Sequence, residues 1–414
     1  MRTWAPGIAL AACLTGCALT SSGAESATLT GKVEDASGKP VEHATVMVYE
    51  AGVKHGYSVY CPSCWPDCGK RAVTDSGGQF RIGGLNPELV FTLLVIQDGY
   101  SATYVKKADP SGGPVATAVL KVRVPPENPA QTVRGLVVDS RGNPAADAVV
   151  EQQGVTYVDD HGRKLSSFGA LNWIDLMAVT NAKGEFEIAY SMPAEKMILS
   201  VSARGMAPKL FTETTGLDRK TLTVASGSTI RGRLVQDGKP VANAEIGLTT
   251  HERRSGTTFS EMIVGTREDG TFDLTNVPAG RVWILYGKME SLAARGVAAE
   301  LVECETKDDG QLVDIGDVQV KSGFTLHGKV VLSGGNAIPP DTRITLSADR
   351  AWDTQMSVLA PDGSFEFKGL AKGVYSLGAG LKNYRLPDEA TGEVLVNRNV
   401  DGVTIALQPT PPRK

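Results

Sequence analysis

The sequence predicts an all-β protein, in which four β-sandwich domains follow one another along the chain after an export signal. Three observations predict this fold: a strand pattern that recurs four times, a period of about a hundred residues, and a composition rich in turn-forming residues. Of the 414 residues, 46 are Gly and 22 are Pro, which suits short strands joined by turns. Hydrophobic residues make up 42% of the chain, enough for a core in each domain.

Each of the four copies opens with a strand in which apolar residues alternate around a glycine. Alternation with a period of two is typical of a strand that buries one face, and the glycine indicates close packing by another segment. A turn containing Gly and Pro comes next, and the chain then enters a second strand, so each copy begins with a β-hairpin. The opening glycines and their flanking apolar residues are Leu29-Gly31-Val33, Val133-Gly135-Val137, Ile230-Gly232-Leu234 and Leu326-Gly328-Val330.

A Gly-x-Phe sequence marks the later part of every copy. The next inward position is again apolar, which predicts a turn that leads into a half-buried strand. Four matches in the same chain order identify a true internal repeat. They are Gly78-Gln79-Phe80, Gly184-Glu185-Phe186, Gly270-Thr271-Phe272 and Gly363-Ser364-Phe365.

The period of the copies sets the predicted domain boundaries. It suits one sandwich per copy and is too long for a solenoid unit, so we expect four domains, each with its own core. We call them repeats 1 to 4. They are predicted to span residues 27–124, 132–225, 228–321 and 324–408, followed by a disordered tail at 409–414.

These motifs resemble those of the carboxypeptidase regulatory-like domain. The sequence from Gly31 to Val41 reads Gly-x-Val-x-Asp-x-x-Gly-x-Pro-Val, and the sequence from Thr74 to Phe80 reads Thr-Asp-x-x-Gly-x-Phe. The resemblance is strongest in the first three repeats and implies a transthyretin-like (Ig-like), carbohydrate-binding-like sandwich. Because such sandwiches host many functions, the resemblance implies a fold and not an activity. The zinc-ligand pair His-x-x-Glu of a peptidase domain does not occur in the sequence.

The N-terminus predicts a bacterial lipoprotein signal peptide over residues 1–16. Arg2 supplies a positive charge, and the apolar stretch Trp4–Leu14 is too short to span a bilayer. The sequence Leu-Thr-Gly-Cys that follows resembles a lipobox, so Cys17 is expected to carry a lipid, which makes the membrane a partner. The alternative is a plain secretory signal with an incidental cysteine. We expect an exported, membrane-anchored lipoprotein in the outer membrane or periplasm of a Gram-negative bacterium.

Three cysteines, Cys61, Cys64 and Cys68, lie close together in the long loop of repeat 1 and have no counterpart in the other repeats. In an oxidising compartment, one interpretation is a disulfide between two of them. A second is a zinc site in which His55 joins the three cysteines, and zinc is the one cofactor that the sequence suggests. A third is a redox pair of the Cys-x-x-Cys type, and free thiols are the remaining alternative.

No motif of a known enzyme site occurs in the sequence, which lacks a nucleophile elbow, a phosphate-binding glycine loop and a dinucleotide fingerprint. We therefore expect a non-catalytic protein. Its net charge of −4 leaves no basic surplus to neutralise phosphates, so a nucleic-acid partner is not expected.

Two tryptophans are candidate ligand-binding residues. Trp173 lies in the apolar segment Phe168–Met177, and Trp65 lies in the cysteine-rich loop. For the apolar segment, the alternative is a strand or short helix that covers a sheet edge. Because loops on a rigid sandwich are common sites of recognition, we predict that loops of repeats 1 and 2 bind a protein or a glycan. A structural spacer that holds partners away from the membrane is the alternative function.

Overall fold

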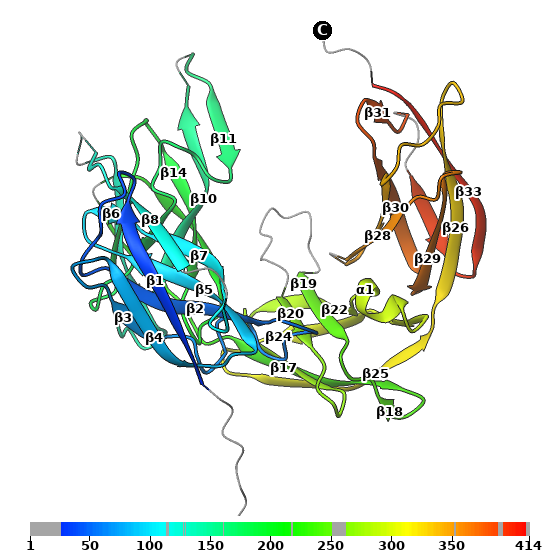
Figure 1. Ribbon diagram of the computed structural model, residues 1–414, viewed down its shortest axis with the longest axis horizontal. Coiled ribbons are helices and arrows are strands. Elements are labelled where there is room, and N and C mark those ends of the chain that lie inside the picture. Colours follow the sequence, from blue (N-terminus) through cyan, green and yellow to red (C-terminus); the bar gives the residue numbers. More distant parts are fainter. Residues whose placement is uncertain are drawn as a thin grey trace, which may run out of the picture.

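The computed structural model describes residues 26–410, except 113–115, 127, 129, 160, 217, 251–261, 352 and 388–391. The predicted signal peptide and Cys17 lie outside the described residues, as do residues 411–414 of the predicted tail. Almost all regular structure in the described part is β-strand (Figure 1). The strands of each repeat form two sheets that enclose a core, which confirms the prediction of tandem β-sandwiches.

Each sandwich combines an opening sheet, which contains the first strand of the repeat, with a second sheet, which contains the other strand of the hairpin. In repeat 1, the opening sheet has the order β4 (Gln79–Leu85), β1 (Ala27–Asp35), β8 (Ala116–Val122) and β6 (Tyr100–Ser101). The second sheet has the order β3 (Arg71–Val73), β2 (Thr45–Val53), β5 (Leu89–Ile96) and β7 (Thr103–Ala108).

Repeat 2 follows the same plan, with a longer hairpin in its second sheet. The opening sheet has the order β13 (Glu185–Ala189), β9 (Thr132–Val138) and β16 (Arg219–Thr223). The second sheet has the order β11 (Lys164–Phe168), β10 (Val149–Val158), β14 (Lys196–Ser202) and β15 (Lys209–Thr214), and β12 (Met177–Val179) also pairs with β10.

Repeat 3 adds a short helix, α1 (Met289–Ala293). Its opening sheet has the order β18 (Lys239–Pro240), β17 (Ser228–Gln236), β25 (Leu312–Ser322) and β23 (Val297–Ala299), with β21 (Thr271–Val277) also paired to β17. The second sheet has the order β20 (Met262–Gly265), β19 (Glu245–Thr250), β22 (Arg281–Gly287) and β24 (Val302–Thr306).

Repeat 4 returns to the plan of repeat 1. Its opening sheet has the order β29 (Ser364–Leu370), β26 (Phe324–Leu332), β33 (Val400–Pro409) and β31 (Tyr384–Arg385). The second sheet has the order β28 (Thr354–Val358), β27 (Arg343–Ala348), β30 (Gly373–Gly380) and β32 (Glu393–Val396). Because β33 includes Pro409, the regular structure extends one residue into the predicted tail.

The two sequence motifs of each repeat meet in the folded sandwich. A Cβ atom added to Gly232 would lie 2.6 Å from Cζ of Phe272, and one added to Gly135 would lie 2.7 Å from Cε1 of Phe186. The phenylalanine ring therefore occupies the space that a side chain at the opening glycine would need. This explains why a glycine on one strand recurs together with a phenylalanine on its antiparallel neighbour.

The four sandwiches form an arch (Figure 1). Repeats 1 and 2 lie side by side at one end, repeat 3 forms the base, and repeat 4 rises at the other end. Repeats 1 and 2 share a small hydrophobic cluster of Met47, Leu94 and Val149. Repeats 3 and 4 meet at α1, where the backbone N–H of Met289 donates to Oδ2 of Asp353 at 2.7 Å.

Candidate functional site

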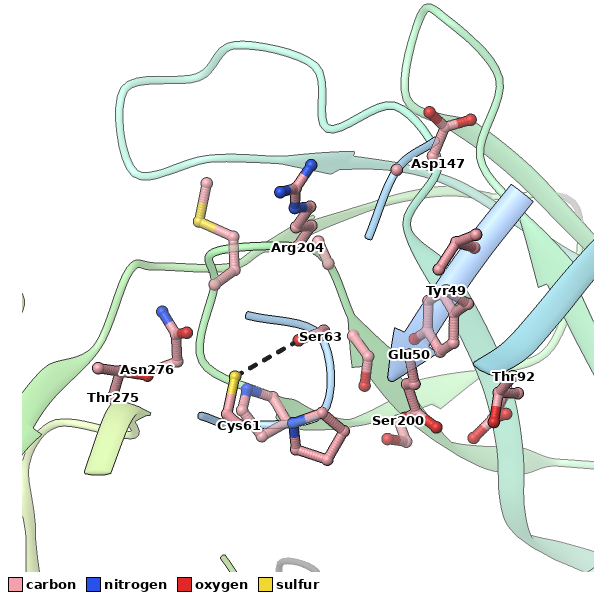
Figure 2. Close-up of a pocket in the computed structure, with 18 of the residues that line it drawn as sticks. Tyr49, Glu50, Cys61, Ser63, Thr92, Asp147, Ser200, Arg204, Thr275 and Asn276 are labelled. Atoms are coloured by element: carbon pink, nitrogen blue, oxygen red, sulfur yellow. Dashed lines mark hydrogen bonds between the residues drawn. The ribbon is translucent and has the colours of Figure 1, made fainter. Parts of the chain in front are cut away.

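The candidate site is a cavity of about 840 Å³ where repeats 1, 2 and 3 meet (Figure 2). The second sheets of repeats 1 and 2 face each other across it, and residues of β20 and β21 in repeat 3 line one side. The residues labelled in Figure 2 come from all three repeats: Tyr49, Glu50, Cys61, Ser63 and Thr92 from repeat 1, Asp147, Ser200 and Arg204 from repeat 2, and Thr275 and Asn276 from repeat 3.

Three carboxylates from repeats 1 and 2 line the cavity, those of Glu50, Asp147 and Glu151. Burial and the nearby charge of Glu151 raise the pKa of Glu50, and Lys106 partly offsets this effect. The hydroxyl of Tyr104 donates a hydrogen bond to Oε1 of Glu151 at 3.2 Å. The ring of Tyr49 lies 5.5 Å from that of Tyr104, and burial raises the pKa of both hydroxyls. Both hydroxyls are therefore protonated at neutral pH, and that of Tyr104 is already donated to Glu151.

Cations line the cavity as well, among them Arg71, Lys106 and Arg204. Arg204 lines both this cavity and a neighbouring one of about 490 Å³, and within the described residues its guanidinium makes no hydrogen bond or ion pair. It lies over Gly69, where an added Cβ would be 2.7 Å from Nη1 of Arg204. In the smaller cavity, Arg231 and Arg267 both pair with Asp273, at 2.7 and 3.0 Å. The two cavities are thus lined by groups of both charges.

The loop between β2 and β3, residues 54–70, forms part of the cavity wall, and we call it the cysteine loop. A disulfide joins Cys61 and Cys64, as in one of the interpretations predicted from the sequence. Sγ of Cys64 lies 3.3 Å from Oγ1 of Thr275 in repeat 3, and the N–H of Gly265 donates to the carbonyl of Ser58 at 2.6 Å. The loop therefore connects repeat 1 to repeat 3, two repeats that are not neighbours in the sequence.

The predicted zinc ligands are not brought together. Cys68 is buried in the core of repeat 1 as a free cysteine, and burial raises the pKa of its thiol to about 11. His55 is exposed to solvent. Across the part of the chain that the structure describes, no group of three or more His, Cys, Asp or Glu side chains is arranged to hold a metal ion. The predicted Cys3His site is therefore not formed, because Cys61 and Cys64 are joined and Cys68 faces the core.

Trp65 and Trp173, the two candidate ligand-binding tryptophans, are each half-buried against the core of their own repeat. Trp65 packs on the core of repeat 1, with its ring edge-on to Tyr60 at 4.8 Å, and its Nε1 donates to Oγ of Ser58 at 3.2 Å. Trp173 packs on the core of repeat 2, edge-on to Tyr157 at 5.7 Å. Each side chain is thus held by its own repeat and leaves only part of its ring to solvent.

The apolar segment around Trp173 has little regular structure. It contains the last residue of β11, Phe168, an isolated bridge between Ile174 and Tyr190, and the first residue of β12, Met177. The bridge ties the segment to the end of the opening sheet. Phe168, at 73% exposure, is its most exposed large apolar side chain.

Comparison with protein families agrees with the sequence motifs. Residues 28–124 match the carboxypeptidase regulatory-like domain. This match covers nearly all of repeat 1. Residues 321–407 match a model described as the second beta sandwich domain of the BOS complex subunit NOMO1-like family. The chain is thus a repeat protein of carboxypeptidase regulatory-like type, with family matches in its first and last repeats.

Similar solved structures are distant in sequence. The Bacillus anthracis TIE protein is 13% identical, with 94% of this chain and 75% of that chain covered and a TM-score of 0.19. A streptococcal ancillary pilin is 14% identical, with 68% and 100% covered and a TM-score of 0.23. Two B repeat units of the Staphylococcus aureus collagen binding protein are 12% identical, with 93% and 100% covered and a TM-score of 0.18. No curated protein matches the chain.

Sequence reasoning missed most residues of the cavity. In the carboxypeptidase regulatory-like domain of repeat 1, Tyr49 and Glu50 follow an irregularity in the pairing of β2 with β5, which the alternation pattern does not reveal. Arg204 lies in a short loop after β14. The sequence signal that pointed to this region was the cysteine loop alone. Among the described residues, no helix has the length and apolar content needed to cross a bilayer.

Proposed function

We propose that this protein is a non-catalytic binding protein of the cell envelope, which holds a glycan in the cavity between repeats 1, 2 and 3. The observation that carries the proposal is the cavity itself, whose volume of about 840 Å³ lies within the usual range for ligand sites. It is lined by repeats 1 and 2, the two repeats that the sequence favours for recognition, with repeat 3 on one side.

The chemistry of the lining favours a ligand rich in hydroxyl groups. Carboxylates accept hydrogen bonds from sugar hydroxyls, while guanidinium and phenolic groups donate to sugar oxygens. Glu50, Glu151, Tyr49 and Arg204 supply these groups within one cavity. A protein ligand would more readily use a broad exposed surface than a cavity set between three repeats.

The arch favours binding over a purely structural role. A spacer gains reach when its modules lie end to end. Here repeats 1 and 2 instead pack side by side, and the cysteine loop of repeat 1 reaches back to repeat 3. This arrangement makes the molecule shorter than a linear row of domains, and it creates the cavity. A binding role accounts for both features, whereas a spacer role accounts for neither.

Mutations of the cavity lining test the binding proposal. A glycan array with the purified chain identifies the ligand, and calorimetry then measures its affinity. Ser200→Leu places an apolar side chain into the cavity, and Glu151→Gln removes one carboxylate; each is expected to weaken binding by about tenfold or more, or about 1.4 kcal/mol. Glu268→Gln, at an exposed site in repeat 3, is the matched control and should bind normally. Equal affinity for all four proteins, or no glycan bound at all, would refute the proposal.

The envelope location rests on the lipobox-like sequence at Cys17. We propose that a lipid on this cysteine anchors the chain in the outer membrane, because Ala18 rather than Asp follows it. Metabolic labelling with an alkynyl fatty acid should label the chain, and Cys17→Ala should abolish the label. A label that persists in Cys17→Ala would contradict the anchor without affecting the proposal for the cavity.

A further inference from the structure

The smaller cavity, of about 490 Å³, adjoins the candidate site. Four residues line both cavities: Ser63, Arg204, Thr275 and Asn276, all labelled in Figure 2. Because the two cavities share these walls, a ligand that occupies the larger one can extend one of its groups into the smaller one. The chemistry of the smaller cavity therefore indicates which group that is.

The smaller cavity carries an excess of positive charge. Its charged lining residues are three arginines, Arg204, Arg231 and Arg267, and one carboxylate, Asp273. Oδ1 of Asp273 accepts a hydrogen bond from Nε of Arg231 at 2.7 Å, and Oδ2 pairs with Arg267 at 3.0 Å. Since a guanidinium has five N–H donors, this shared carboxylate occupies a minority of the donors in the cavity.

Two other carboxylates lie near the arginines of repeat 3 but do not line the cavity. Asp314 is paired with Arg231 across β17 and β25, and Asp269 interacts with Arg267. Arg204, which comes from repeat 2, differs from both. It is exposed, and within the described residues its guanidinium makes no hydrogen bond or ion pair. Arg204 is therefore the lining cation that is available to a ligand.

The cysteine loop places an aromatic ring in the same cavity as Arg204. Tyr60 of this loop lines the cavity and is 42% exposed, and its ring is positioned by the edge-on contact with Trp65 at 4.8 Å. Gly69 of the same loop lets the guanidinium of Arg204 approach the loop backbone closely. A partly exposed aromatic ring can contact the apolar C–H groups of a sugar. The smaller cavity thus combines a surface for a sugar with a cation for an acidic group.

We propose that the ligand of the candidate site is an acidic glycan, whose carboxylate or sulfate group binds Arg204 in the smaller cavity. This inference rests on the glycan-binding role proposed above and adds the class of glycan. A guanidinium binds such oxyanions through paired, charge-assisted hydrogen bonds. Arg231 and Arg267 add to the positive potential around the bound group. A neutral glycan would leave this excess of positive charge without a partner.

A glycan array with matched pairs tests the inference. One pair is tetragalacturonate and its methyl ester, and the other is a chondroitin sulfate tetrasaccharide and its desulfated form. The members of each pair differ in one kind of charged group, so the pair that responds distinguishes a carboxylate from a sulfate. The chain should bind the charged member of one pair about tenfold more tightly, or better. Arg204→Gln should abolish this preference, and it should leave the fold intact because Arg204 is exposed and unpaired.

Arg398→Gln is the matched control, since it removes the same charge from an exposed arginine of repeat 4, and it should keep the preference. A preference that persists in Arg204→Gln would overturn the inference, because the acidic group would then bind elsewhere. Charged members that bind no better than their neutral counterparts would also overturn it. In that case, binding of neutral glycans would leave the proposed function standing, whereas a chain that binds no glycan at all would refute both.

Discussion

At the scale of single residues, one buried threonine has the same role in three repeats. Oγ1 of Thr180 accepts a hydrogen bond from the N–H of Ala148 at 2.8 Å and donates one to the carbonyl of Ala145 at 2.6 Å. Thr74 and Thr266 make the equivalent pairs of bonds in repeats 1 and 3. In repeat 4, Leu359 stands at this position. Its N–H donates to the carbonyl of Thr342, as the N–H of Thr74 does to that of Ala44, but its side chain cannot form the other two bonds.

Replacing this threonine should destabilise the repeat that contains it. Thr180→Val leaves the N–H of Ala148 and the carbonyl of Ala145 without partners in a buried position, so the free energy of unfolding of repeat 2 should fall by about 1–3 kcal/mol. Thr221→Val, at an exposed position of β16, should change it by less than about 0.5 kcal/mol. Each repeat contains one tryptophan, at Trp65, Trp173, Trp283 and Trp352. Fluorine NMR of fluorotryptophan-labelled protein therefore reports denaturant unfolding repeat by repeat.

A histidine in repeat 4 should make that repeat sensitive to pH. Nε2 of His327 lies 2.7 Å from Oε1 of Glu366, and Nδ1 lies 2.8 Å from Oδ1 of Asp401. The hydrogen bonds to Glu366 and then to Asp401 raise the pKa of His327 above its ordinary value. A raised pKa means that the folded state holds the proton more tightly than the unfolded state. The stabilisation is therefore complete at low pH and is lost as pH rises through the folded-state pKa.

An NMR titration of the five histidines measures this effect. The resonance of His327 should titrate above about 6.5, the value for an unperturbed histidine, and Glu366→Gln should move its midpoint downward. The unfolding midpoint reported by Trp352 should fall as pH rises above about 6.5. In His327→Gln the midpoint should depend less on pH. A His327 that titrates below its ordinary value would contradict the two ion pairs.

At the scale of elements, the cysteine loop connects repeats 1 and 3, which are not neighbours in the sequence. Its chain is folded by the Cys61–Cys64 disulfide and by the bond from the N–H of Ala51 to the carbonyl of Pro62 at 2.8 Å. In this shape, Ser58 and Cys64 reach repeat 3. Gly265 leaves the space that the loop needs, because a Cβ atom added to Gly265 would lie 2.8 Å from Cβ of Tyr57.

Removing the disulfide should loosen this connection. In Cys61→Ser/Cys64→Ser the loop has more conformations, so the N–H of Gly265 should lose its bond to Ser58 and exchange with solvent more than tenfold faster, which corresponds to about 1.4 kcal/mol. The N–H of Val241, which bonds to Leu234 within repeat 3 at 2.9 Å, is an internal control and should exchange at its normal rate. Unchanged protection at Gly265 would mean that the loop holds its shape without the disulfide.

At the scale of the whole molecule, the sequence predicts the modules well and their assembly poorly. Gly232 and Phe272 repeat with the period of the fold, so their packing is encoded locally and recurs in every copy. Glu50 and Glu151 are on strands, at positions that face away from the core of their repeat, and Arg204 is in a loop. At such positions the alternation pattern predicts only that a residue is polar. The three residues form a site only because repeats 1 and 2 turn their second sheets toward each other. That orientation depends on contacts such as Met47 with Val149, which no single-repeat motif contains.

This contact between modules leads to a prediction about cooperative unfolding. Val149 lies in repeat 2 but is buried against Met47 and Leu94 of repeat 1, so Val149→Asp would place a charge between the two sheets. The unfolding midpoints reported by both Trp65 and Trp173 should fall, while that of Trp352 in repeat 4 stays constant. Val122→Asp, at a position that is 64% exposed, should shift none of them. If Val149→Asp moved Trp173 alone, repeats 1 and 2 would unfold independently, and their shared face would contribute little to stability.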